Sequence, residues 1–382
     1  MTPTTDSSQI DRLPSAVSAA IDALVQQRRT SEFIPGLALA VSQNGQTVLA
    51  KGYGYAHCAT SDCTSGTQVY ADTPFELGSV TKSFTAIGLL RIFDNPTLNT
   101  STLGALDLDA PISRYLNSDP DFTLPAAWAN ITPRQLLSMS SGIEDFGTNT
   151  LTWPEILTQV GMTPLLFPPG TGYCYSNPGF LLLGAIIQQL TQAPYDQFMQ
   201  QQVFTPAGMA KTLIHTPTNQ PSDLATGYTY ETATQTWKVP MPRPPLSSFS
   251  AGAIISTAVD LGAFMSALQN QTLLTPATYQ LMWTDVTLQD PTRPGLWGLG
   301  WEVATAEPYQ IFRKDGGLPG ITSQVSLYEA GTSTIGVAIV SNEDSVKGYV
   351  PLAVDIIDAV LASTPVPNPP GAGIGCTPTP GP

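Results

Sequence analysis

Apolar residues near the start of the chain follow two different periods. Residues 14–28 carry apolar side chains at helical spacing and begin with a proline and a serine, which predicts a helix. The next apolar runs, Leu37–Ser42 and Thr47–Tyr55, predict two strands. Because an Asn-Gly pair at positions 44–45 lies between these runs, the strands should form an antiparallel hairpin.

The C-terminal part of the chain carries similar signals. Thr257 with an acidic residue three positions on, Asp260, predicts a helix that begins with a capping box. A closing helix is predicted over residues 350–362. Between the two helices, three segments are predicted to be strands: Tyr309–Lys314, Thr322–Tyr328 and Thr334–Ser341.

The middle of the chain reads as mostly helical. A helix is predicted from about Ser79 to Phe93, and the residues from roughly 95 to 245 then mix helical segments with long loops rich in Pro, Thr and Asn. The clearest of these segments are 133–140, 154–161 and 178–191. We find no internal repeat.

This order of elements predicts an α+β fold. Strands from both chain ends can form one antiparallel sheet flanked by the terminal helices, with a mostly helical lobe inserted into the sheet domain. The expected boundaries are 10–75 and 246–363 for the discontinuous sheet domain, 76–245 for the helical lobe, and 364–382 for a Pro/Gly-rich tail. That tail should be extended or disordered.

Composition indicates a globular protein and argues against polyanionic binding partners. The 382 residues are 42% hydrophobic and include 13 Phe, 13 Tyr and 6 Trp. Acidic residues outnumber basic ones 29 to 15, and a net charge of −14 argues against nucleic acid or an anionic membrane surface as a partner. No apolar run approaches the ~18–20 residues of a membrane span. The oligomeric state stays open.

The cysteines and the N-terminus bear on the compartment. Cys58 and Cys63 lie in a polar loop and could close a small ring, and with Cys174 and Cys376 they make an even count whose pairing stays open. An even count of surface-type cysteines favours an oxidising compartment, so we expect a periplasmic or secreted protein, with a cytoplasmic one as the alternative. The first nine residues lack the basic-then-apolar order of a leader, which fits a cytoplasmic protein or a trimmed leader.

Ser79 and Lys82 form the first pair that suggests catalysis. They stand three positions apart on a predicted helix, so their side chains share one face. A serine hydroxyl is a weak nucleophile that needs a base beside it, and a desolvated lysine can be neutral enough to serve. At the helix N-terminus, Ser79 would also place the helix dipole near a developing oxyanion. A Ser-x-x-Lys pair is short enough to occur by chance, so it needs support from other motifs.

A second motif, Tyr175-Ser176-Asn177, lies in a predicted loop before the helix at 178–191. A tyrosine whose pKa is lowered by neighbouring lysines could act as a general base and then protonate the leaving group. The amide of Asn177 could orient Lys82 or a substrate carbonyl. The same run, followed by Pro-Gly, is also typical of an ordinary turn.

A third motif, Lys314-Asp315-Gly316-Gly317, ends a predicted strand and leads into the next. Glycine in a strand often marks the close approach of a ligand or another backbone, so a substrate could lie along this edge. The N–H groups of Gly317 and Ser79 could then bind an oxyanion. The alternative is a hairpin turn with a surface Lys-Asp pair.

Taken in this order, the three motifs resemble those of the serine β-lactamase and penicillin-binding-protein superfamily. The Tyr-x-Asn form of the second motif is similar to the class C β-lactamase branch, with its related esterases, D-aminopeptidases and D-Ala-D-Ala carboxypeptidases. The resemblance covers residues 14–362. Six stretches carry it: Phe75–Lys82, Thr132–Gly142, Tyr175–Gly184, Pro206–Met209, Ala251–Asp260 and Gly298–Trp301.

The resemblance implies a role for each motif residue. Ser79 would be the acylated nucleophile, Lys82 would activate it, and Tyr175 would move protons to the leaving group and from the deacylating water. Lys314 would hold charge near Tyr175, and the N–H groups of Ser79 and Gly317 would bind the oxyanion. Substrate binding would fall to five residues: Asn177, Lys314, Asp315, Gly316 and Gly317.

Asp315 departs from the family pattern. β-Lactamases and carboxypeptidases usually carry Thr or Ser there, and the hydroxyl helps to bind a substrate carboxylate. An aspartate would repel a carboxylate and could attract an amine. Many esterases and aminopeptidases of the family have His at the position of Lys314.

The sequence therefore predicts a serine hydrolase of the peptidase or esterase type. It would cleave an amide or ester bond of a small-molecule or peptide substrate through an acyl-enzyme on Ser79, without a cofactor. The alternatives are a true β-lactamase, an acyl transferase and a non-catalytic penicillin-fold binding protein.

Two other hydrolase chemistries fit this sequence poorly. There is no Gly-x-Ser-x-Gly elbow, since the nearest stretch, Ser248–Gly252, lacks the first glycine. The two histidines, His57 and His215, are expected at the surface, and no set of cysteines and histidines has zinc-binding spacing. We therefore expect no metal. Four aromatic residues could line a substrate pocket or belong to the core: Trp153, Tyr173, Tyr228 and Trp237.

Overall fold

A computed structural model of the chain describes residues 6–146, 151–241, 248–286, 288, 297–344, 346 and 348–361. The predicted tail at 364–382, and Cys376 within it, lie outside the described residues.

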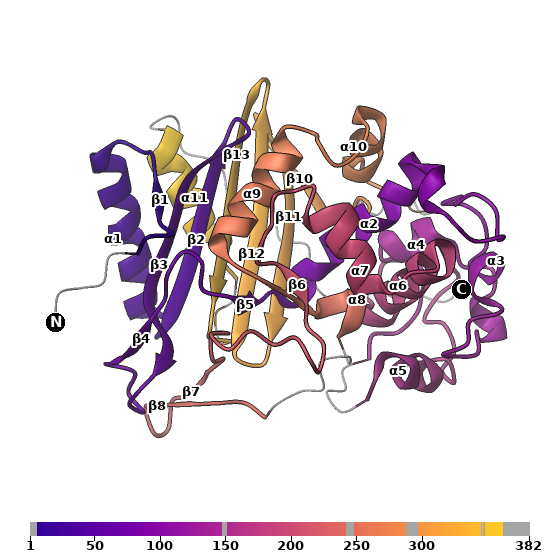
Figure 1. The fold of residues 1–382 in the computed structure, drawn as a ribbon, viewed down its shortest axis with the longest axis horizontal. Coiled ribbons are helices and arrows are strands. Elements are labelled where there is room, and N and C mark those ends of the chain that lie inside the picture. Colours follow the sequence, from indigo (N-terminus) through magenta and orange to yellow (C-terminus); the bar gives the residue numbers. More distant parts are fainter. Residues whose placement is uncertain are drawn as a thin grey trace.

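The main sheet combines strands from both ends of the chain, which confirms the predicted α+β fold (Figure 1). Its strand order is β1-β3-β2-β13-β12-β11-β10, all neighbours are antiparallel, and β4 pairs with β3. The N-terminal β2 pairs with the C-terminal β13 from Leu37–Ser341 to Gln43–Ile335. The strand bounds are β1 Ile10–Asp11, β2 Gly36–Gln43, β3 Gln46–Cys58, β4 Gly66–Gln68, β10 Glu302–Ala306, β11 Tyr309–Leu318, β12 Ile321–Ala330 and β13 Ser333–Ser341.

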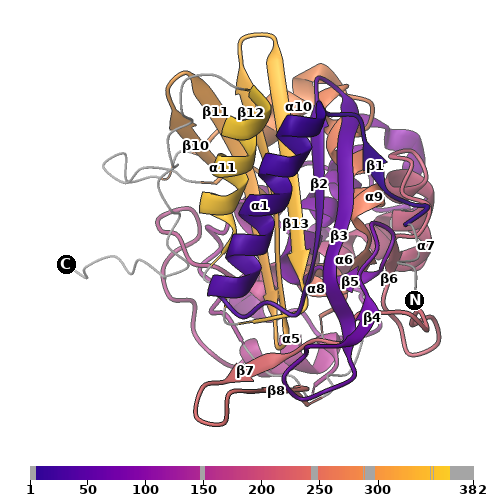
Figure 2. The same cartoon turned by 90° about the vertical axis from the view of Figure 1, so that its left-hand side faces the viewer.

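Helices cover both faces of this sheet. Helices α1 (Ser15–Ser31) and α11 (Val350–Leu361) lie side by side over one face (Figure 2). Their apolar residues join the inward side chains of β2, β12 and β13 in one core cluster. Helix α9 (Ala258–Gln269) packs on the other face against β2, β3 and β13. Because both faces of β2 are covered, seven of its eight residues are buried and its sequence is an apolar run instead of an alternation.

The helical part is built around α2 (Thr81–Asp94), which lies among α6, α8 and the residues that follow α7. Every α2 residue from Thr81 to Leu90 is buried, so this helix is enclosed on all sides, and its polar side chains, Lys82 among them, lie inside the protein. The surrounding helices and turns are η1 Gly78–Val80, η2 Pro96–Leu98, α3 Ser113–Leu116, η3 Ala126–Trp128, α4 Pro133–Leu137, α5 Trp153–Val160, α6 Asn177–Thr191, α7 Tyr195–Met199, η4 Gln200–Phe204, α8 Phe249–Gly252 and α10 Pro276–Trp283. Two small sheets complete the fold, with strands β5 Phe75–Glu76, β6 Leu213–Ile214, β9 Ile254–Ser256, β7 Thr229–Glu231 and β8 Thr236–Lys238.

Several predicted boundaries were wrong. The helix predicted from about Ser79 is present, but Ser79 itself lies in the short η1 turn that leads directly into α2 at Thr81. The predicted helix at 133–140 ends at Leu137, because Met139 has a positive φ of 58°. Strand β11 does not end at Lys314 but continues to Leu318, so the third motif lies inside a strand.

The capping box predicted at Thr257 is only half present. The Thr257 side chain does accept a hydrogen bond from the backbone N–H of Asp260. The Asp260 carboxylate, however, accepts from the Lys211 N–H and the Thr212 hydroxyl instead of returning a bond to Thr257. Asp260 therefore connects α9 to the segment before β6, a contact that local sequence does not reveal.

Candidate active site

The structure brings strand β11 directly against the η1 turn that carries Ser79. A Cβ added to Gly316 would lie 2.1 Å from the carbonyl oxygen of Leu77 and 2.4 Å from the Ser323 hydroxyl. Only glycine allows this approach, as the sequence pattern suggested. Along the described residues, β10 pairs with β11 only as far as Arg313, so the segment with Gly316 and Gly317 has an edge without a strand partner.

Lys82 lies at the centre of the site and is fully buried. Its Nζ is 3.0 Å from the Ser79 Oγ, and it donates hydrogen bonds to Asn177 Oδ1 at 2.6 Å and to the Ala251 carbonyl at 2.7 Å. Burial, followed by the nearby charge of Lys314, lowers the pKa of Lys82 well below its usual value. Among the residues that the structure describes, no carboxylate forms a close ion pair with Lys82 to offset the cost of burying its charge.

These contacts serve both protonation states of Lys82, since an ammonium can donate to all three oxygens. An uncharged Lys82 has two hydrogens, which the oxygens of Asn177 and Ala251 can accept, and one lone pair that faces the Ser79 hydroxyl. The Tyr175 hydroxyl donates to the Ser79 Oγ at 2.6 Å. A continuous chain of hydrogen bonds therefore runs from Tyr175 through Ser79 to Lys82.

The expectation of a low pKa for Tyr175 was wrong. Burial raises the pKa of Tyr175 above its usual value, and the charges of Asp145, Glu302 and Asp315 act in the same direction. Lys82 Nζ and Lys314 Nζ lie 4.9 and 5.3 Å from the ring centroid, over the ring instead of beside the hydroxyl. Tyr175 is therefore a neutral phenol in the resting site, and the lowered pKa belongs to Lys82.

Asn177 is fixed by a residue that the sequence analysis missed. Its backbone N–H donates to Asp145 Oδ1 at 2.9 Å, and its side-chain Nδ2 lies 3.4 Å from Asp145 Oδ2. This contact turns the Asn177 Oδ1 toward Lys82. Asp145 lies in the loop after α4 and follows no spacing rule, so the sequence offered no signal for it.

Lys314 reaches the site from β11 and is 2% exposed. Its Nζ donates to the Asp315 carbonyl at 2.9 Å and lies 5.2 Å from the centroid of the Trp297 ring. Burial lowers the pKa of Lys314. Trp297 also stacks on Tyr173, one of the four candidate wall residues, with 5.7 Å between ring centroids. Trp297 itself was not predicted as part of the site.

The Asp315 side chain extends from the side of β11 opposite to that of Lys314. Side chains alternate along β11, and Asp315 is paired with Gln324, whose amide oxygen accepts from the Tyr349 N–H just before α11. Burial, and then the charge of Glu302, raises the pKa of Asp315 to about 6, and its buried Oδ1 has no hydrogen-bond partner among the described residues. Selection against substrate carboxylates by Asp315 stays a prediction.

The remaining aromatic candidates lie away from the serine. Trp153 is buried in the helical core and stacks on Phe249 with 4.9 Å between centroids. The Tyr228 hydroxyl accepts from the Cys58 N–H, and Trp237 packs on Tyr230.

The histidines and cysteines partly differ from expectation. His215 is not a surface residue, since its side chain is 12% exposed and its Nδ1 lies 3.5 Å from Glu76 Oε1. His57 is also half-buried, on β3, within 2.8 Å of the Thr226 hydroxyl. Cys58 and Cys63 form a disulfide, whereas Cys174 is buried instead of surface-exposed.

The described part of the chain shows neither a membrane-spanning helix nor a cluster of metal-binding side chains. It contains no helix that is both long and apolar enough to cross a membrane. Within the same residues, no group of three or more His, Cys, Asp or Glu side chains is placed to hold a metal ion.

Comparison with known proteins gives a consistent assignment. The profile of the family described as Beta-lactamase matches residues 21–361. Unguisins hydrolase ungD' of Aspergillus campestris is 28% identical over 341 residues, which are 84% of this chain and 60% of that protein. The chain thus spans less than two thirds of the length of this curated relative.

Solved structures agree on the fold. The octameric penicillin-binding protein homologue from Pyrococcus abyssi has a TM-score of 0.75 at 21% identity, over 91% of this chain and 78% of that chain. The D-amino acid amidase from Ochrobactrum anthropi, complexed with D-phenylalanine, has a TM-score of 0.74 at 24% identity, over 91% of this chain and all of the other.

Proposed function

Because the chain belongs to the beta-lactamase family, we propose that it is a serine hydrolase that cleaves an amide or ester bond through an acyl-enzyme on Ser79. The observation that carries this proposal is the hydrogen-bonded chain of Tyr175, Ser79 and Lys82, with Lys82 buried beside the nucleophile. A nucleophile in contact with a neutral base is the arrangement that covalent catalysis requires.

In acylation, the Ser79 Oγ attacks the substrate carbonyl carbon and its proton moves to the lone pair of Lys82. The N–H groups of Ser79 and Gly317 are the proposed donors to the resulting oxyanion. The leaving group departs with the proton of the Tyr175 hydroxyl, because that hydroxyl lies 2.6 Å from the reacting oxygen. The phenolate formed at Tyr175 is short-lived and lies under the ammonium groups of Lys82 and Lys314.

In deacylation, water gives a proton to Tyr175 and attacks the ester carbonyl. The bond to Ser79 breaks, and Lys82 returns its proton to the Ser79 Oγ. The net reaction adds one water across the amide or ester, and the enzyme regains its starting protonation state.

An amide or peptide substrate is the form of this proposal that we favour. The named relatives include a hydrolase of unguisins and a D-amino acid amidase. Asp315 stands where β-lactamases of the family carry Thr or Ser, and this sequence difference supports a peptidase or esterase over a true β-lactamase, although the Asp315 side chain extends from the side of β11 opposite to Lys314. A β-lactamase is the second candidate, favoured by the family profile itself.

The test is a substrate panel with a matched serine control. Wild type, Ser79→Ala and Ser31→Ala, an exposed serine on α1, are assayed on p-nitrophenyl acetate, D-phenylalaninamide and nitrocefin. We expect turnover of the ester and the amide by wild type and Ser31→Ala, and loss of at least ~10³-fold in Ser79→Ala, as for other removed nucleophiles. Faster turnover of nitrocefin than of the amide would favour the β-lactamase. No turnover of any of the three would support a non-catalytic binding protein.

We also propose a periplasmic or secreted site of action. The disulfide between Cys58 and Cys63 supports it, because such bonds persist in oxidising compartments. Thiol alkylation of the protein in intact cells of its source should leave this pair unmodified until a reductant is added. Alkylation without reductant would indicate the cytoplasmic alternative.

A further inference from the structure

The ammonium of Lys314 is enclosed by its neighbours in the active site. Lys314 is 2% exposed, and its Nζ donates a hydrogen bond to the Asp315 carbonyl at 2.9 Å. The same Nζ lies over two aromatic rings, 5.3 Å from the Tyr175 centroid and 5.2 Å from the Trp297 centroid. Because the two ring planes are inclined by 64°, the rings cover different sides of the ammonium. One carbonyl oxygen and two ring faces therefore match the three hydrogens of Lys314, and its described surroundings leave none for a substrate.

Trp297 is held in place over Lys314. Its ring stacks on the Tyr173 ring with 5.7 Å between centroids, and it meets the Tyr175 ring edge-on with 6.3 Å between centroids. Its backbone forms a β-bridge with Glu302, the first residue of β10. With 4% of its surface exposed, Trp297 is a packed side chain that covers Lys314.

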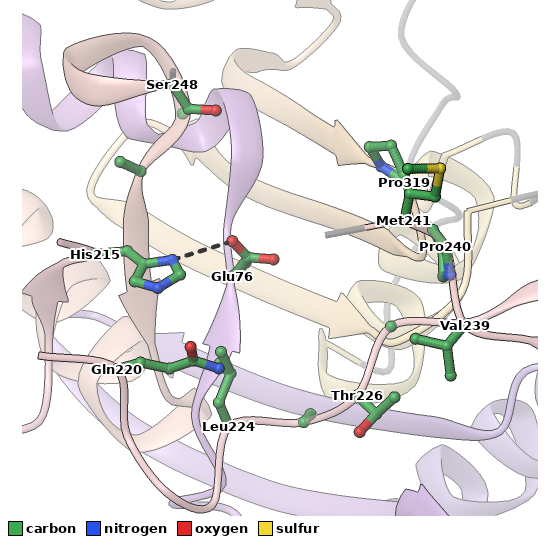
Figure 3. A pocket seen from close by; sticks show the side chains of 14 residues that line it. Glu76, His215, Gln220, Leu224, Thr226, Val239, Pro240, Met241, Ser248 and Pro319 are labelled. Atoms are coloured by element: carbon green, nitrogen blue, oxygen red, sulfur yellow. Dashed lines mark ion pairs between the residues drawn. The ribbon is translucent and has the colours of Figure 1, made fainter. Parts of the chain in front are cut away.

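The nearby cavity of about 400 Å³ does not lead to Lys314 (Figure 3). Neither Lys314 nor Trp297 is among the described residues that line it. Tyr173 and Tyr175, which contact the Trp297 ring, are both partly exposed. Removal of the Trp297 ring would therefore open a space between these tyrosines and the buried ammonium. The lining of the cavity in Figure 3 includes Glu76, His215 and Pro319.

A carboxylate that pairs with Lys314 would have to lie on the leaving group of the substrate. In the proposed acylation the Tyr175 hydroxyl gives its proton to the leaving group, and Lys314 lies over the ring of that same tyrosine. The C-terminal residue of a peptide carries a carboxylate when it departs as a free amino acid. With Trp297 in place, such a carboxylate would lose water without gaining the ammonium as a partner, which is unfavourable. A leaving amine or alcohol without a carboxylate meets no such cost.

We infer that Trp297 is a specificity-determining residue that closes Lys314 to substrate carboxylates. The substrate class is then an amide, an ester or a non-terminal peptide bond whose leaving group carries no carboxylate, and a carboxypeptidase reaction is disfavoured. The inference rests on the proposed acyl-enzyme function but makes a separate claim about the leaving group. It places the discrimination on Trp297, on the Lys314 side of β11, whereas the Asp315 side chain extends from the opposite side.

Two aryl esters with leaving groups of similar size test this claim: 3-carboxyphenyl acetate and 3-carbamoylphenyl acetate. The first releases a phenol with a carboxylate and the second a neutral phenol. The readout is the ratio of kcat/KM for the carboxyphenyl ester to that for the carbamoylphenyl ester, each corrected for its alkaline hydrolysis rate. This ratio should be below one in the wild type. Trp297→Ala should uncover Lys314 and raise it about tenfold or more, the contribution of one hydrogen bond between charged groups.

Three further variants show whether the gain comes from the uncovered ammonium. Trp297→Phe keeps an aromatic ring and should keep the ratio near the wild-type value. Trp237→Ala removes a tryptophan on β8, away from the serine, and should leave the ratio unchanged. Trp297→Ala combined with Lys314→Met should lose the gain, because no ammonium is left to receive the carboxylate.

The outcomes separate this inference from the proposed function. An unchanged ratio in Trp297→Ala, with Ser79-dependent turnover of the carbamoylphenyl ester, would overturn the role of Trp297 alone. An equal rise in the combined Trp297→Ala and Lys314→Met variant would also overturn it. A wild-type ratio of about ten or more would overturn it without any substitution, so a Trp297→Ala protein that does not fold leaves the claim testable. Lack of Ser79-dependent turnover of both esters would instead overturn the proposed function, and this inference with it.

Discussion

Replacing Lys314 by methionine should raise the pKa of Lys82. The Nζ atoms of the two lysines lie 4.9 and 5.3 Å from the centroid of the Tyr175 ring. They are therefore at most about 10 Å apart, where two unit charges repel by about 1.6 kcal/mol at an effective dielectric constant of about 20. Removing one charge relieves this repulsion, so the pKa of Lys82 should rise by about one unit.

The assay is the pH dependence of kcat/KM for p-nitrophenyl acetate. If neutral Lys82 is the base, activity is lost as pH falls through its pKa, which gives the acid limb of the profile. In Lys314→Met that limb should move to higher pH by about one unit. Lys211→Met, which removes a lysine that is 54% exposed and paired with Asp72, should leave the limb in place. An acid limb that stays in place or moves to lower pH in Lys314→Met would refute the reasoning.

Other replacements have equally direct outcomes. Asp145→Asn should move the acid limb to lower pH, because the Asp145 charge raises the pKa of Lys82; no shift would contradict this. Gly316→Ala should lower the free energy of unfolding by about 1–3 kcal/mol in urea melts, because its Cβ would clash with backbone, whereas Gly317→Ala has open space and should not. The pKa of Asp315 is raised to about 6 in the folded protein from an ordinary 3.8, so its contribution to stability falls as pH rises between these values. Asp315→Asn should therefore stabilise the protein more at pH 8 than at pH 4, and an equal change at both would argue against a buried, charged Asp315.

Much of the fold could be predicted because its signals are local. The Asn-Gly turn at 44–45 indicates the β2–β3 hairpin, and the apolar run in β13 reflects its burial on both sides. The short strands β5, β6 and β9 could not be predicted, because each has only two or three residues and forms through partners far along the chain.

Some residues of the candidate active site could likewise be predicted from local sequence, and others could not. Ser79, Lys82, Tyr175 and Asn177 could be found because each lies in a recognisable motif, and the structure brings them into contact. Asp145 and Trp297 lie in loops without a motif and reach the site only through tertiary packing. The direction of the Tyr175 pKa was missed because it depends on burial of the hydroxyl, which the spacing of the motif does not reveal.

Acid-quench mass spectrometry during steady-state turnover tests the central claim most directly. With p-nitrophenyl acetate, the wild type should gain the mass of one acyl group, located on the peptide that contains Ser79, and Ser79→Ala should gain none. An acyl group on another residue, or full turnover by Ser79→Ala, would contradict the account.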